Sequence, residues 1–137
     1  MTYRFAGFLS PSRVVCPAVL PSGAAWREIS TPFEGSGVRL PEFVGKTPEV
    51  GIIRALATTL GFASSERWLY LTYDCWGGQI DYVYGFGCSF GEPFGPREED
   101  ARSEVEAAFT SLMGKLGLST GQALRFTPFE RGFWGET

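Results

Sequence analysis

Two runs of alternating residues flank Gly77-Gly78, and this pattern constrains the fold more than any other feature of the sequence. Residues 67–76 and 79–88 alternate along their length as strands do, and both are rich in aromatic residues. Both glycines can adopt positive φ, which a two-residue primed hairpin turn requires. The pattern therefore predicts an antiparallel hairpin with Gly77-Gly78 at its tip.

The register of this hairpin assigns its side chains to two faces. A two-residue turn pairs Trp76 with Gln79 and Asp74 with Asp81. Because side chains alternate along a strand, one face is expected to be core. The expected core residues are Leu69, Leu71, Tyr73, Cys75, Ile80, Tyr82, Tyr84 and Phe86. The opposite face is expected to be exposed.

The exposed face predicts a binding site for a cation. Two carboxylates directly opposite each other repel, and they destabilise a strand pair. Large aromatic residues surround them, and this combination suits an Arg or Lys of a partner, a charged ligand or a metal. The predicted partner-binding residues are Asp74, Trp76, Asp81, Tyr70, Trp68 and Gln79.

Two structural alternatives to this binding site stay open. A change of one residue in the register would separate the two acids. Alternatively, an arginine of the chain itself, such as Arg54, Arg67 or Arg125, could form an internal ion pair with them.

The other patterns predict short strands and two helices. Strands are expected at residues 3–9, 13–19, 25–30, 37–43 and 123–129. Apolar residues at helical spacing predict helices at about 48–60 and 97–116, and local turn signals predict a loop at 89–96. We therefore expect an α+β fold: a single domain over residues 1–137, with a mainly antiparallel sheet and two amphipathic helices packed on one face.

A second group of acids lies at the start of the predicted helix 97–116. Glu98, Glu99 and Asp100 stand where the helix dipole favours negative charge. They form either a solvated helix start or a secondary docking surface for a basic protein.

Composition limits the functional classes. The chain has no histidine, which removes Ser–His and Cys–His triads and nearly all catalytic zinc sites. Cys16, Cys75 and Cys88 lack CxxC spacing, so reduced thiols in a cytoplasmic protein are expected. The net charge is −3, with no basic run and no stretch of about 20 apolar residues. Arg13 and two prolines interrupt the apolar N-terminal segment, so we expect no signal peptide. We expect no cofactor, no metal, no nucleic-acid or membrane partner and no catalytic activity.

The segment WLYLTYDCWGGQIDYVYG resembles the T-D-Y-x-G-G strand-turn-strand stretch of the immunity proteins that bacteria encode beside polymorphic toxins. The order of helix, Gly-Gly hairpin, acidic helix and short final strand is similar too, over roughly residues 48–130. Here Cys75-Trp76 precedes the glycines where a single aromatic is expected, and the first 45 residues have no counterpart. The resemblance implies a cytoplasmic, non-enzymatic protein that binds and blocks a cognate toxin.

Three functions follow as hypotheses. The first is an immunity-type inhibitor whose acidic patch fills the basic cleft of a toxin. The second is an enzyme that uses Asp74 and Asp81 as a carboxylate pair, one of them with a raised pKa. The third is a structural or adaptor subunit of a larger assembly. A toxin-like reading frame immediately upstream would favour the first.

Overall fold

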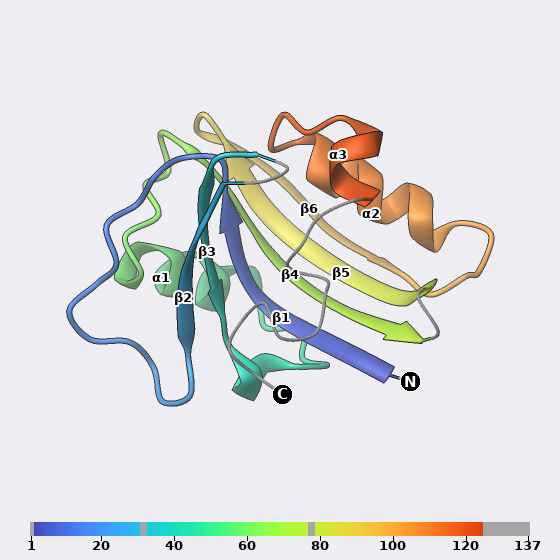
Figure 1. Ribbon diagram of the computed structural model, residues 1–137, viewed down its shortest axis with the longest axis horizontal. Coiled ribbons are helices and arrows are strands. Elements are labelled where there is room, and N and C mark those ends of the chain that lie inside the picture. The colour runs from blue at the N-terminus through green and yellow to red at the C-terminus, as the bar shows by residue number, and fades with distance from the viewer. Residues whose placement is uncertain (1, 31–32, 77–78, 125–137) are drawn as a thin grey trace.

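A six-stranded antiparallel sheet forms the centre of the molecule (Figure 1). The computed structural model describes residues 2–30, 33–76 and 79–124. The strands lie in the order β2-β3-β1-β4-β5-β6, and each neighbouring pair is antiparallel. Their bounds are β1 Thr2–Ser10, β2 Ala25–Ile29, β3 Gly35–Arg39, β4 Arg67–Trp76, β5 Gln79–Ser89 and β6 Glu92–Glu99. The α+β class and the mainly antiparallel sheet are therefore confirmed.

Short helices complete the described part of the chain. They are the 3-10 helix η1 Pro41–Phe43 and the α-helices α1 Val50–Thr59, α2 Val105–Gly114 and α3 Thr120–Leu124. The prediction of a helix at 48–60 is confirmed to within two residues. Gly61 follows this helix with a φ of 90°, a conformation that glycine adopts readily and that commonly ends a helix.

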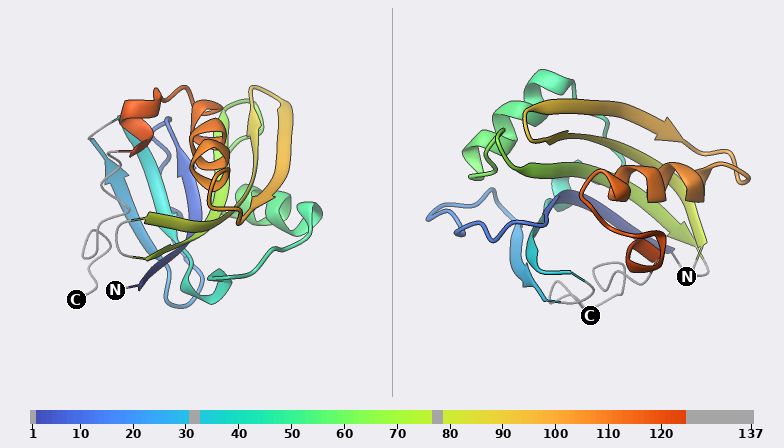
Figure 2. Two further views of the ribbon diagram at one scale, coloured as in Figure 1. Left: turned by 90° about the vertical axis from the view of Figure 1, so that its right-hand side faces the viewer. Right: turned by 90° about the horizontal axis from the view of Figure 1, so that it is seen from above.

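The helices cover both faces of the sheet, so the prediction that they share one face is wrong (Figure 2). Helices α2 and α3 pack on the face that carries Leu71 and Tyr73. Helix α1 packs on the opposite face, which carries Trp68 and Tyr70. The physical reason is that the central strands have large apolar or aromatic residues on both sides, and each side has to be removed from water.

Strand β6 replaces the predicted loop at 89–96 and the first turn of the predicted helix at 97–116. Phe90 and Gly91, with φ of 51° and 88°, reverse the chain after β5 and return it along the edge of the sheet. Pro93 and Pro96 are tolerated because β6 pairs only with β5 among the described residues, and an edge strand does not need every N–H. Glu98 and Glu99 consequently lie in a strand, and the helix begins later, at Val105.

The predicted N-terminal and C-terminal strands are confirmed only in part. Strands β1 and β2 agree with the predictions at 3–9 and 25–30, whereas residues 13–19 form no strand in the described structure. The predicted strand 37–43 divides into the end of β3 and η1. Ala123 and Leu124 belong to α3, and the rest of the predicted strand 123–129 lies outside the described residues.

Candidate site at the hairpin end of the sheet

A β-bulge changes the predicted register of the hairpin close to its tip. Trp76 pairs with Gln79 and Cys75 with Ile80, as predicted. The register then shifts, and Asp74 lies opposite Tyr82. Asp81 is thus the extra residue of β5, and the prediction that Asp74 and Asp81 face each other is wrong. The register alternative that separates the acids is the one the structure adopts.

Because of the bulge, the β5 side chains that follow Asp81 lie on the face of the sheet opposite to the one predicted. Tyr82, Tyr84 and Phe86 lie with Trp68 and Tyr70, where α1 and η1 cover most of them. Trp68 and Tyr70 are only 2% and 1% exposed. The prediction that these two residues rim an exposed patch is therefore wrong, because a helix covers the face that was expected to be open. They are core residues of the protein. The side chain of Trp76 lies outside the described part of the structure.

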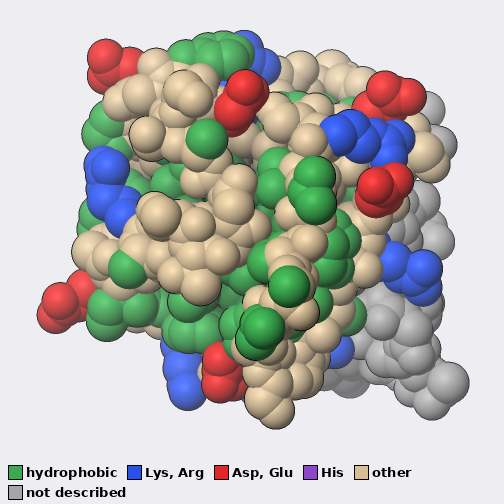
Figure 3. Space-filling view, turned by 90° about the vertical axis from the view of Figure 1, so that its left-hand side faces the viewer, with side chains coloured by type: hydrophobic (Ala, Val, Ile, Leu, Met, Phe, Trp, Pro, Cys, Tyr) green, Lys and Arg blue, Asp and Glu red, His purple; other side chains and the backbone are tan. Residues whose placement is uncertain are grey.

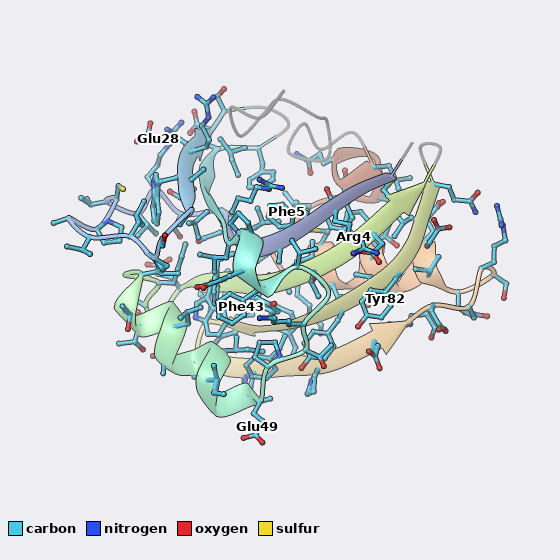
Figure 4. The ribbon with its side chains drawn as sticks, turned by 90° about the horizontal axis from the view of Figure 1, so that it is seen from below. Arg4, Phe5, Glu28, Phe43, Glu49 and Tyr82 are labelled. Atoms are coloured by element: carbon cyan, nitrogen blue, oxygen red, sulfur yellow. The ribbon has the colours of Figure 1, made fainter. Side chains whose placement is uncertain are left out.

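Beyond the helices, the same face keeps an uncovered row of polar side chains that crosses four strands. Arg4 of β1 lies opposite Asp74 of β4, and Asp74 lies opposite Tyr82 of β5. The Tyr82 hydroxyl donates to Oε2 of Glu98 in β6 at 2.6 Å. Figure 4 shows Arg4 and Tyr82 on this same face, in strands β1 and β5, with β4 between them. We call Arg4, Asp74, Tyr82 and Glu98 the polar row.

The ion pair inside the polar row is weak. Arg4 Nε lies 3.6 Å from Asp74 Oδ1, a separation too long for a hydrogen bond, and the arginine side chain is 60% exposed. Exposed pairs of this kind contribute about 0–1 kcal/mol. Asp74 Oδ1 has no hydrogen-bond partner among the described residues. An internal arginine therefore does sit beside Asp74, as the second alternative expected, but it comes from β1 and leaves the carboxylate undersatisfied.

Tyr82 holds its proton firmly. Its pKa is raised above the usual value first by burial, then by the hydrogen bond to Glu98 and by the negative charges of Glu98 and Asp74. The hydroxyl is consequently a permanent donor at physiological pH, and it fixes the position of the Glu98 carboxylate. The sequence patterns did not identify Tyr82 or Arg4 as site residues. They predict a core position for Tyr82, and Arg4 lies beside Asp74 only because β1 pairs with β4, a long-range contact.

The other side of the hairpin end carries Gln79, Asp81 and Cys75. Gln79 is exposed, and its Oε1 accepts a hydrogen bond of 2.7 Å from Nη2 of Arg102. Asp81 is half-buried. The pKa of the Cys75 thiol is raised mainly by the burial of the thiol and secondly by the negative charge of Asp81. Both faces of the hairpin end thus place carboxylates near solvent.

The three unpaired cysteines predict an order of reactivity. Cys16 is exposed and should be alkylated fast. Cys75 is half-buried with a raised pKa and should react slowly, and Cys88 is buried and should react negligibly. Asp81→Asn removes a negative charge, lowers the pKa of Cys75 and should increase its alkylation rate at pH 8 by about twofold to threefold. Mass spectrometry after a brief iodoacetamide treatment measures all three sites. Glu92→Gln is the control, and an unchanged Cys75 rate in Asp81→Asn would contradict the assignment.

Acidic residues are concentrated in one part of the chain. Residues 74–106 contain eight Asp or Glu and two Arg, a net charge of −6, whereas the rest contains seven acidic and ten basic residues. The predicted secondary group, Glu98, Glu99 and Asp100, runs from the end of β6 into the loop before α2, and all three are exposed or half-buried. These residues therefore lie at the same end of the sheet as the polar row.

The opposite end of the molecule has a different character. Figure 3 shows hydrophobic side chains gathered over much of this face. Val15 and Val19, in the segment that connects β1 to β2, are 89% and 82% exposed. Figure 3 also shows Asp and Glu together with Lys and Arg on this face, so this end of the molecule carries charges of both signs.

Neither a metal site among the described residues nor a similar protein points to a function. Within the described ranges, no group of three or more Cys, Asp or Glu side chains is placed to hold a metal ion. In the same ranges no helix has the length and hydrophobicity needed to cross a bilayer. Comparison with family models, with curated proteins and with solved structures finds no match for this chain.

Proposed function

We propose that this protein is a cytoplasmic, immunity-type inhibitor that binds and neutralises a cognate bacterial toxin with a basic surface. The observation that carries the proposal is a group of five acids toward the hairpin end of the sheet, within a segment (residues 74–106) whose net charge is −6: Asp74, Asp81, Glu98, Glu99 and Asp100. An acidic surface of this kind accelerates encounter with a basic cleft and disfavours acidic partners. The resemblance of the hairpin sequence to immunity proteins supports the same function.

The polar row gives the proposed surface a fixed geometry. Tyr82 holds Glu98 in place, and the side chain of Asp74 is 29% exposed beside Arg4, although its Oδ1 atom is itself buried. An incoming arginine or lysine would find carboxylates already oriented by the sheet, so little side-chain entropy would be lost on binding. Binding through this row requires no catalytic group in the inhibitor itself.

Co-expression tests the function directly. The product of the gene immediately upstream should arrest growth when it is expressed alone in a bacterial host, and growth should recover when this chain is expressed with it. The two proteins should also co-purify, with an affinity that falls as salt is raised from about 50 to 500 mM because the contact is electrostatic. Arrest that this chain does not relieve, with no complex formed, would refute the proposal.

The carboxylate-pair enzyme has less support. That hypothesis rests on Asp74 and Asp81 lying opposite each other, whereas Asp74 lies opposite Tyr82 and Asp81 is the extra residue of the bulge. The structural or adaptor subunit has one favourable observation, the exposure of Val15 and Val19. Val15→Ser with Val19→Ser would abolish assembly in that case, and would leave toxin binding unchanged if the acidic end is the interface.

A further inference from the structure

A cavity of about 290 Å³ lies between the hairpin and α2, on the face opposite the polar row. Ile80 of β5 forms one wall, and Val105 and Phe109 of α2 form another. Exposed residues at its rim, among them Gln79, Arg102 and Glu106, leave it open to solvent. The cavity is slightly smaller than ordinary small-molecule pockets, which begin at about 300 Å³. Its size suits a single side chain or a compact ligand.

The polar groups around the cavity favour a cation. Glu106 and Arg102 both line it, but the guanidinium of Arg102 donates to Gln79 at 2.7 Å and is held at the edge. Asp81 acts on the thiol of Cys75, which also lines the cavity, and raises its pKa. The side chains at and beside the cavity therefore carry two carboxylates and one guanidinium, a net charge of −1. This net charge favours a cationic ligand over an anionic one, and a cation would gain an ion pair with Glu106 that an uncharged ligand cannot form.

We propose that this cavity receives a lysine or arginine side chain of the partner protein, with its aliphatic stem between Ile80 and Phe109 and its charged head at Glu106. Long basic side chains bind in this way, since their stems are apolar and only the head group needs polar contacts. The identity of the partner rests on the proposed function. The cavity lies at the same end of the sheet as the polar row, so a partner that covers the hairpin tip would contact both.

Three compounds with the same apolar stem test the proposal without the partner: hexylammonium, hexanol and hexanoate. Each is titrated into the isotope-labelled protein, and backbone NMR shifts are followed. Hexylammonium should give saturable shifts at Ile80 and Val105 and none at Ile53, which lies in α1 on the other face. Its affinity should exceed that of hexanol by about fivefold, the upper range for an exposed charge pair, and that of hexanoate by at least as much. Stronger binding of hexanoate than of hexylammonium would overturn the proposal, and so would the absence of saturable shifts with any compound.

A matched pair of variants tests the role of Glu106. Glu106→Gln should abolish the preference for hexylammonium over hexanol. Glu92→Gln should preserve this preference, because it makes the same change of net charge at an exposed residue at the far end of β6. Equal loss of the preference in both variants would overturn the proposal, because it would show a general charge effect. Failure of this titration leaves the co-expression result untouched, so the inference and the proposed function fail separately.

Discussion

Replacement of Phe109 by alanine is expected to lower the free energy of unfolding by about 3–5 kcal/mol. Phe109 is fully buried, and its ring centroid lies 6.5 Å from that of Tyr73 on β4. It is the aromatic side chain through which α2 contacts the centre of the sheet. The loss of unfolding free energy is expected to lie near the top of this range of about 3–5 kcal/mol. Phe109 borders the cavity, so few neighbouring atoms can move into the space that its ring would leave.

Chemical denaturation monitored by circular dichroism measures this effect. Ser111→Ala is the matched control, because it changes an exposed residue on the same helix and should alter stability by no more than about 0.5 kcal/mol. A loss below about 1.5 kcal/mol in Phe109→Ala would contradict the packing of α2 described above.

The pairing of β4 with β5 and the position of α1 were predictable because each depends on a local pattern. Gly77-Gly78 between two alternating runs predicts the turn, and Trp76–Gln79 pairing follows from it. The bulge at Asp81 was not predictable in the same way. A single extra residue reverses which face every later side chain occupies, and Tyr82, Tyr84 and Phe86 suit either face because both are covered.

The composition of the candidate site was partly predictable, but its geometry was not. Asp74 and Glu98 were identified from the sequence, and both belong to the polar row. Their neighbours Arg4 and Tyr82 depend on which strands are adjacent, and that order is decided by long-range packing. The acids and prolines of residues 92–99 fit a loop and a helix start as well as an edge strand, since all three tolerate exposure and missing N–H donors.

Reversal of charge at Glu98 is expected to produce the largest effect on binding. Glu98→Lys removes the acceptor of the Tyr82 hydroxyl and places a cation where a basic partner is proposed to dock. The expected loss is about 2 kcal/mol or more, a factor of about 30 in Kd. Stability should change little, because Glu98 is an exposed residue of an edge strand. Asp74→Asn should weaken binding in the same direction, since it removes the other carboxylate of the polar row.

Isothermal titration calorimetry with the product of the upstream gene tests the central claim most directly. The Kd is measured for the unaltered chain, for Glu98→Lys and for Glu34→Lys, which makes the same change of charge on an exposed residue outside the acidic segment. The proposed interface predicts that Glu98→Lys weakens binding by about 30-fold and that Glu34→Lys changes it by less than about threefold. Equal affinities for Glu98→Lys and the unaltered chain, with both proteins folded, would contradict the claim that the hairpin end is the binding surface.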